Sequence, residues 1–329
     1  MTQPLVLTCG EPAGIGPELA PLAWQALKNE LAFFWLGDPR HLPATAPVVL
    51  IDTPAQAADA MADGLPVLAH DFGPAATPGQ ANPAHAAHVI AVIEQAVGFV
   101  QNAQASALCT APIHKKALQD GAGFAFPGHT EFLAHLAGQK EVVMMLACAA
   151  LRVVPATIHI PLAAVPQALT PDLLRQTITL THHAMQRDFG IAAPRIAVAG
   201  LNPHAGEGGA MGQEELRWIA PLLAQMRAGG IDIIGPLPAD TMFHARARAG
   251  YDVAICMYHD QALIPIKTID FDHGVNISLG LPFVRTSPDH GTAFDIAGRG
   301  QANPSSLIAA LRMGAEMAKA RQNAQHSQS

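Results

Sequence analysis

The sequence predicts an α/β fold in which mostly parallel sheets are covered by helices. Half of the 329 residues are hydrophobic and only 14% are charged, a composition that suits strands buried between helical layers. Short apolar runs alternate along the chain with segments of helical periodicity, which is the order that βαβ units produce. Several of these runs end abruptly in polar residues, as strands do where such sheets bind ligands.

Composition excludes several classes of protein. The net charge of −7 and the lack of a basic run argue against nucleic-acid binding. The N-terminus has no cationic region of a signal peptide, and the apolar run 142–151 is too short to span a bilayer. We therefore expect a cytoplasmic protein with no membrane partner. Four cysteines lie in apolar runs without metal-ligand spacing and are predicted to be reduced core residues: Cys9, Cys109, Cys148 and Cys256.

The chain is predicted to begin with a strand over residues 5–8. The glycine-rich stretch from Gly10 to Glu18 then turns into a helix, with Pro17 in its first turn. Free amides in such a turn can hold an anion, although the spacing matches neither the dinucleotide fingerprint nor a Walker loop. A tight structural turn is the alternative. Residues 38–84, which are rich in Pro and Ala, are expected to form peripheral strands and loops.

A helix is predicted to start at Asn82 and Pro83, because apolar residues then recur at helical spacing up to Val100. The strand that follows, 106–109, is predicted to deliver three polar side chains at its end: Thr110, His114 and Lys115. Lysines of this kind are also common on solvated surfaces. The two interpretations are therefore a ligand-binding lysine and a surface lysine.

The motif PGHTEF is predicted to start another helix. Thr130 is expected to cap a helix from Glu131 to Ala137, which places His129 directly before the helix amides. A histidine in this position can help to bind an anion, and a surface loop histidine is the alternative.

The second half of the chain repeats the alternation. Thr170 and Pro171 are predicted to start a helix that Gly190 ends, and Asp240 is expected to cap a helix reaching Ala249. A last helix is predicted over 303–319. Four apolar runs are predicted as strands: 142–147, 152–160, 195–201 and 253–258.

The glycine-rich segment 273–300 is predicted to be a site built from loops, with neither helix nor strand. It gathers polar and charged residues among its glycines: Asn276, Arg285, His290, Asp295 and Arg299.

Three histidines share one position relative to predicted strands. His159, His204 and His259 each follow an apolar strand, and parallel strands would bring all three to one sheet edge. Three imidazoles with open positions suit a catalytic divalent metal of the zinc or cobalt type. The alternative is a chance alignment, since the chain has 16 histidines and no local motif supports this set.

Long motifs in order resemble the 4-hydroxythreonine-4-phosphate dehydrogenases of vitamin B6 synthesis. They run from Gly10 to Gly300: GEPAGIGPE, TAPIHK, GHTEF, NPHAGEGG, GPLPADTMF, MYHDQALIPIK and HGVNISLGLPFVRTSPDHGTAFDIAGRG. The resemblance covers nearly the whole chain and is weak at about 38–84 and in the C-terminal tail.

The segment DHGTAFDIAGRGQANP is also similar to the loop that holds the adenosine end of the cofactor in isopropylmalate and isocitrate dehydrogenases. This likeness implies the two-lobed fold of that superfamily, with a cleft between the lobes. We expect one lobe over 1–130 and 285–329, and the other over 131–284. It also implies cofactor contacts at His290, Gly291 and Asp295.

The resemblance assigns the remaining site residues. His159, His204 and His259 match the family's metal ligands, and five residues match its substrate contacts: His129, Thr130, Lys267, Asn276 and Arg285. It further implies a homodimer whose active site is shared between the subunits.

The implied reaction is NAD-dependent oxidation of 4-hydroxythreonine 4-phosphate to a 3-keto acid, which decarboxylates to 3-amino-2-oxopropyl phosphate. A bound Zn, Co or Mg ion is expected to polarise the hydroxyl oxygen. The candidates for the base that takes the proton are Asp240, Asp260 and Lys267, and Asp260 can instead orient a ligand histidine.

Three questions stay open at the level of sequence. One is whether NAD or NADP is preferred. A second is whether the chain is a paralogue acting on erythronate or threonate 4-phosphate, since these substrates differ by one amino group. The third is whether the chain is a non-catalytic protein that binds a phosphorylated metabolite. The intact set of three histidines and Lys267 argue against this alternative.

Overall fold

The computed structural model describes residues 3–326, with side chains described up to residue 324. The chain divides into two compact units. The first comprises Met1–Val142 with Leu281–Lys319, and the second comprises Val143–Gly280 with Ala320–Ser329. The lobes predicted from sequence, which meet at 130/131 and 284/285, remain a prediction.

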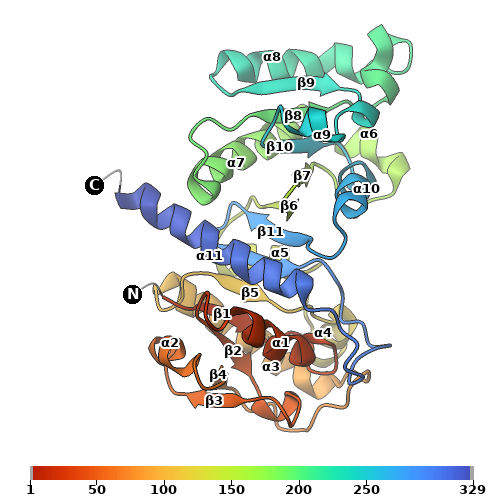
Figure 1. Ribbon diagram of the computed structural model, residues 1–329. Helices are drawn as coiled ribbons and strands as arrows, with labels where there is room; N and C mark the ends of the chain where they lie inside the picture. The colour runs from red at the N-terminus through yellow and green to blue at the C-terminus, as the bar shows by residue number, and fades with distance from the viewer. Residues whose placement is uncertain (1–2, 327–329) are drawn as a thin grey trace. The chain divides into compact units, whose positions relative to one another are not determined.

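The sheet of the first unit is entirely parallel. Its order is β3 (Val48–Ile51), β4 (Leu65–Ala69), β2 (Phe33–Gly37), β1 (Leu5–Thr8), β5 (Leu108–Thr110) and β12 (Arg285–Pro288). The central strands β1 and β2 are fully buried and apolar, as a strand covered on both faces must be. The peripheral strands predicted within 38–84 are β3 and β4 (Figure 1).

The helices of the first unit are α1 (Gly16–Leu27), α2 (Ala57–Ala60), α3 (Ala86–Gln101), α4 (Lys115–Ala122), α5 (His129–Leu136) and most of α11 (Ser305–His326), with short 3-10 turns at η1 (Pro39–His41), η2 (Pro54–Gln56) and η3 (Pro83–His85). The stretch Pro83–Gln101 is long and apolar enough to cross a membrane by length and composition alone. However, α3 packs against β1 and β5 and buries Val92 and Ile93 completely, as the core helix of a globular unit does.

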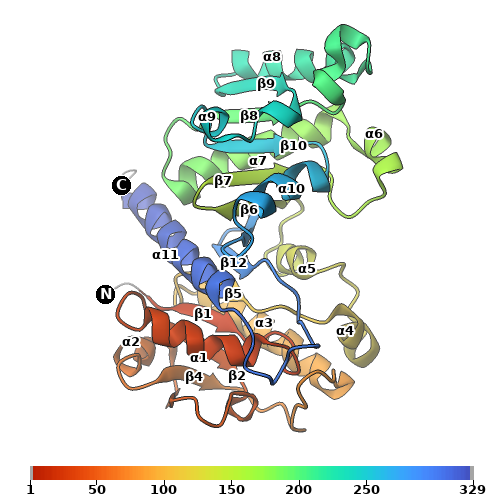
Figure 2. The same cartoon turned by 45° about the vertical axis from the view of Figure 1, so that its right-hand side comes forward.

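The sheet of the second unit is mixed. Its order is β11 (Val275–Leu279), β6 (Val143–Cys148), β7 (Leu151–Pro155), β10 (Val253–Cys256), β8 (Ile196–Ala199) and β9 (Ile233–Leu237). The strands from β7 to β9 are parallel, whereas β6 is antiparallel to both of its neighbours. Figure 2 shows β9, β8, β10, β7 and β6 side by side in this order.

The helical segments of the second unit connect these strands. They are η4 (Leu162–Ala164), α6 (Val165–Ala168), α7 (Pro171–Phe189), η5 (Pro203–Gly209), the π-helical turn η6 (Glu215–Ile219), α8 (Ala220–Ala228), η7 (Ala239–Thr241), α9 (Ala245–Arg248) and α10 (His259–Ile269). The predicted α/β class, with mostly parallel strands and covering helices, is confirmed.

Helix α7 has the bounds predicted from sequence, and local chemistry explains why. Thr170 accepts a hydrogen bond from the backbone N–H of Leu173 at 3.2 Å, and Pro171 occupies the first turn, where no intrahelical donor is needed. Gly190 ends the helix with a φ of 68°, a left-handed conformation that glycine adopts without steric cost.

Two predicted caps are wrong. Helix α5 begins at His129 after Gly128, so Thr130 lies inside the first turn and does not cap the helix. The cap of α9 is His244, whose Nδ1 accepts from the backbone N–H of Ala247, and Asp240 lies earlier in η7. In both places another residue takes the position before the helix.

The segment 273–300 is not built from loops alone, as was predicted. Asn276 lies in β11 and Arg285 lies in β12. Glycines on both sides concealed these strands in the sequence, and their pairing with β6 and β5 is set by residues far away in the chain. The last helix also extends seven residues beyond Lys319, to His326.

Candidate active site

The second unit brings the three predicted metal ligands to one sheet edge. Strand β10 lies between β7 and β8 and is parallel to both. His159 follows β7, His204 follows β8, and His259 follows β10, each at the carboxyl end of its strand. Neighbouring parallel strands end at the same edge, which is where α/β sheets bind ligands.

Two of these imidazoles are adjacent. The ring centroids of His159 and His259 are 5.9 Å apart. His259 is the first residue of α10, and its Nδ1 lies 2.7 Å from Oδ1 of Asp260, which leaves Nε2 for a ligand. Within residues 3–324, no three His, Cys, Asp or Glu side chains come close enough together to hold a metal ion.

His204 lies in a loop with an unusual backbone. Six consecutive residues from His204 to Gly209 have positive φ, and three of them carry side chains: His204, Ala205 and Glu207. Left-handed conformations cost an L-residue about 1–2 kcal/mol each, so other contacts must hold this loop.

The carboxylate of Glu215 provides those contacts. Glu215 is 3% exposed. Its carboxylate accepts two hydrogen bonds from Asn202, one from the backbone N–H at 2.8 Å and one from the side-chain Nδ2 at 2.9 Å. Nδ2 of Asn202 also donates to Glu214, at 2.8 Å. A Cβ atom at Gly206 would lie only 2.8 Å from Oε2 of Glu215, so the loop closes over the carboxylate only with glycine there.

The first unit contains a cluster formed by a buried arginine and His129. Arg285 is 3% exposed and donates to Oγ1 of Thr110 from both Nε and Nη2, at 3.2 and 2.7 Å. Burial lowers the pKa of its guanidinium to about 10, which shows that the charged form is poorly solvated.

His129 belongs to the same cluster. Its Nε2 is buried and has no hydrogen-bond partner among the described residues. Its pKa is well below the ordinary value, first because of burial and then because of the charges of Arg285 and Lys115. A buried polar nitrogen without a partner, beside buried positive charge, fits an anionic ligand.

The predicted substrate contacts are divided between the two units. His129, Thr130 and Arg285 belong to the first, and Lys267 and Asn276 to the second. Lys267 lies in the last turn of α10, with Nζ 5.5 Å from the centroid of the Phe271 ring. Eight residues of helix separate it from His259, which corresponds to about 12 Å along the axis.

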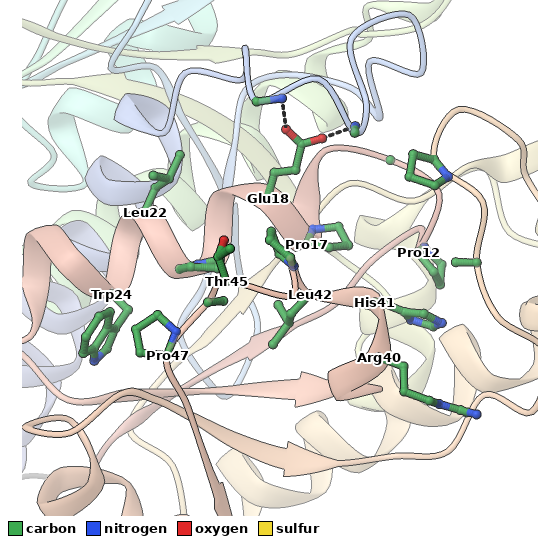
Figure 3. A pocket seen from close by; sticks show the side chains of 18 of the residues that line it. Pro12, Pro17, Glu18, Leu22, Trp24, Arg40, His41, Leu42, Thr45 and Pro47 are labelled. Carbon is green, nitrogen blue, oxygen red and sulfur yellow. Dashed lines mark hydrogen bonds between the residues drawn. The ribbon is translucent and has the colours of Figure 1, made fainter.

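Helix α1 holds the loop that carries the predicted cofactor contacts. The carboxylate of Glu18 accepts hydrogen bonds from the backbone N–H groups of Gly298 and of Gly300, the latter at 3.0 Å (Figure 3). The backbone N–H of Ile15 donates to the carbonyl oxygen of Thr292 at 3.1 Å. A cavity of about 850 Å³ lies against this junction, lined by Glu18, Gly298, Gly300 and residues of 40–47.

The three predicted cofactor contacts lie just before this junction. Nε2 of His290 is buried without a hydrogen-bond partner among the described residues, while its Nδ1 lies 3.0 Å from the carbonyl oxygen of Gly291. Asp295 is exposed. The orphaned nitrogen of His290 fits a ligand that supplies a polar atom there.

Sequence reasoning overlooked Glu18, Glu215 and Gln261, each of which braces a loop that carries candidate site residues. For Glu18 a signal was available, because an acidic residue in the first helical turn after a glycine loop can also reach a neighbouring loop. The other two gave no local signal, because their partners are 13 and 61 residues away.

Comparison with known proteins agrees with the motifs. The family model described as Pyridoxal phosphate biosynthetic protein PdxA matches residues 30–314. The chain belongs to the PdxA family. A relative named 4-hydroxythreonine-4-phosphate dehydrogenase, from Roseobacter denitrificans, is 64% identical over 318 residues, which cover 96% of this chain and 98% of that protein. A relative of the same name from Paracoccus denitrificans is 61% identical, with 97% and 99% covered.

The fold of this PdxA-family chain matches a solved structure as well. The crystal structure of a 4-hydroxythreonine-4-phosphate dehydrogenase from Klebsiella pneumoniae superposes with a TM-score of 0.87 at 36% identity, and the match covers 97% of this chain and 98% of the other. The predicted family resemblance and the prediction of an enzyme are therefore confirmed.

Proposed function

We propose that this chain oxidises 4-hydroxythreonine 4-phosphate with NAD, giving a 3-keto acid that loses carbon dioxide to form 3-amino-2-oxopropyl phosphate. The observation that carries this proposal is the pairing of buried Arg285 with half-buried His129, whose Nε2 is buried and has no hydrogen-bond partner among the described residues. The names of the PdxA relatives supply the substrate.

The phosphate group is assigned to this cluster. A guanidinium that burial leaves poorly solvated gains most from a dianion, and Nε2 of a neutral His129 can donate one more hydrogen bond. Thr130 lies in the first turn of α5, where the backbone amides also favour an anion. Lys267 and Asn276 are proposed as further substrate contacts.

The histidines of the sheet edge are proposed to hold a divalent metal ion. Neutral imidazoles suit Zn²⁺ or Co²⁺ better than Mg²⁺, which prefers oxygen ligands. The pair His159 and His259 fits this role in ring spacing and in the orienting carboxylate of Asp260. A metal here would supply a Lewis acid for the substrate hydroxyl and for the charge that develops as carbon dioxide leaves.

Proton removal from the hydroxyl is assigned to Asp240. Of the three candidates, Asp260 is engaged by His259, and Lys267 lies about 12 Å along the helix from His259, which suits the far end of a substrate. Asp240 is exposed in η7, which contacts the loop η5 that carries His204. Asp240 is therefore proposed as the base because its segment adjoins the loop of one proposed metal ligand.

The nicotinamide cofactor is proposed to bind along the loop of His290, Gly291 and Asp295. Supporting observations are the unpartnered Nε2 of His290, the clasp between Glu18 and Gly298, and the adjoining cavity, whose size is typical of ligand sites. NAD is the proposed cofactor, and NADP is the alternative.

A homodimer that shares its active site, in the cytoplasm, completes the proposal. Large apolar side chains are exposed on the elements that carry the histidines of the second unit. Leu162, three residues after His159, is 69% exposed, and Ile264 on α10 is 63% exposed. Such residues beside a site suit a subunit interface.

The substrate assignment is tested by NADH formation from 4-hydroxythreonine 4-phosphate and from erythronate 4-phosphate under the same conditions. We expect the first substrate to have the higher kcat/KM by about tenfold or more, which corresponds to about 1.4 kcal/mol of discrimination. A preference for erythronate 4-phosphate would assign the chain to the paralogous reaction, and activity with neither would favour a binding protein.

A further inference from the structure

The backbone of Met257, directly after β10, is hydrogen-bonded both to the end of β7 and to the side chain of Gln261. Its carbonyl oxygen accepts from Oγ1 of Thr157 at 2.8 Å, and Thr157 lies two residues before His159. Its N–H donates to Oε1 of Gln261 at 2.7 Å, and Met257 itself lies two residues before His259. Strand ends of β7 and β10 are thereby joined by buried hydrogen bonds.

Gln261 extends this link to the third strand end. Its Nε2 donates to the carbonyl oxygen of Gly200 at 2.8 Å, four residues before His204. One amide side chain therefore uses its oxygen on the end of β10 and its nitrogen on the end of β8. The result is a continuous chain of hydrogen bonds from Thr157 through Met257 and Gln261 to Gly200.

The link is buried along its whole length. Thr157 is 4% exposed, Met257 is fully buried, and Gln261 is 9% exposed. Removing the Gln261 amide would leave a backbone N–H and a backbone carbonyl buried without partners, since water does not reach them. Each such group costs about 1–3 kcal/mol, a penalty that the loops would relieve by moving apart.

We propose that Gln261 is a positioning residue for the histidine edge, and that it sets the spacing between the loop of His204 and the start of α10. This inference rests on the proposed metal site. It assigns Gln261 no contact with substrate or metal. Its role is to hold two ligand-bearing backbones in register, as the residues behind metal ligands commonly do.

Two variants distinguish the acceptor role of Oε1 of Gln261 from the donor role of its Nε2. Gln261→Met removes both hydrogen bonds at similar volume. Gln261→Glu keeps the acceptor for Met257 and, in its ionised form, loses the donor to Gly200. The matched control is Gln186→Met, because Nε2 of Gln186 also donates to a backbone carbonyl, that of Ala192 at 2.9 Å, away from the histidine loops.

The measurement is Zn²⁺ affinity of the full-length chain without substrate, by competition with a chromophoric chelator, together with amide hydrogen exchange over 200–212. We expect both Gln261 variants to bind Zn²⁺ roughly 10- to 100-fold more weakly and to exchange faster in 200–212, with the control unchanged. Thermal unfolding shows which variants are folded; if Gln261→Met is not, Gln261→Glu decides.

Wild-type affinity and wild-type exchange in the folded Gln261 variants would overturn the inference. A different failure identifies the proposed function as wrong: if the wild-type chain binds no Zn²⁺ while exchange over 200–212 still rises in the variants, Gln261 is a structural bridge with no metal ligands to position.

Discussion

Arg285 and Thr110 are 175 residues apart in the chain, and the guanidinium of Arg285 donates two hydrogen bonds to the single hydroxyl oxygen of Thr110. The pairing of β12 with β5 places them side by side in the first unit. The hydroxyl fixes the direction of the guanidinium and brings no negative charge of its own, and this is where we propose that the anionic substrate binds.

Arg285→Ala should therefore raise KM for 4-hydroxythreonine 4-phosphate far more than KM for NAD. Loss of a buried charged contact costs about 2–3 kcal/mol, or roughly 30- to 150-fold in substrate affinity. Steady-state kinetics with each substrate varied in turn measures both constants. Arg246→Ala, on the exposed surface of α9, is the control. Equal increases in the two KM values would contradict the assignment of Arg285 to the phosphate.

His129 should make the fold sensitive to acid. Its pKa in the folded chain is lowered, so below about pH 6.5 the unfolded chain takes up a proton that the folded chain does not. The free energy of unfolding should fall as the pH drops from about 7 to about 5, and His129→Gln should reduce that fall. Burial also lowers the pKa of His41, to about 4, so part of the pH dependence should remain.

Urea unfolding at the two pH values measures this effect. His183→Gln, on an exposed position of α7, is the matched control. If the His129 variant loses as much stability on acidification as the wild-type chain does, the burial of a neutral His129 is refuted.

Glu18→Gln should weaken cofactor binding specifically. The amide can accept only one of the two hydrogen bonds from Gly298 and Gly300, and its NH₂ group would face the other backbone N–H. We expect KM for NAD to rise roughly fivefold or more with little change in KM for the phosphorylated substrate, as measured by initial rates. Glu94→Gln, exposed on α3, is the control. An unchanged KM for NAD would show that the loop does not depend on this clasp.

The left-handed backbone at His204 should cost the folded chain stability with any residue other than glycine. His204→Gly should be more stable than His204→Ala by about 1 kcal/mol, because φ of 52° costs glycine nothing and costs alanine a steric penalty. Chemical denaturation of the two variants gives the difference. Equal stability, or a more stable alanine variant, would mean that the loop does not adopt this backbone in solution.

Elements defined by local chemistry could be predicted from the sequence. The bounds of α7 follow from Thr170, Pro171 and Gly190, whose effects reach only one turn. The common edge of His159, His204 and His259 also followed, because it needs only that three apolar runs become parallel strands of one sheet.

Strands and contacts that depend on residues far away in the chain could not be predicted from the sequence. Asn276 and Arg285 looked like loop residues because β11 and β12 gain their partners from β6 and β5, which lie more than 100 residues earlier. The brace made by Gln261 was hidden for the same reason, since Gly200 becomes its neighbour only when β8 and β10 pair.

The most direct test of the proposed metal-dependent oxidation is to measure Zn²⁺ or Co²⁺ content and NADH formation in His204→Ala, alongside the wild-type chain. The account predicts a folded variant, by thermal unfolding, that retains little metal and has lost metal-dependent NADH formation from 4-hydroxythreonine 4-phosphate. A folded His204→Ala chain with wild-type metal content and wild-type turnover would contradict it.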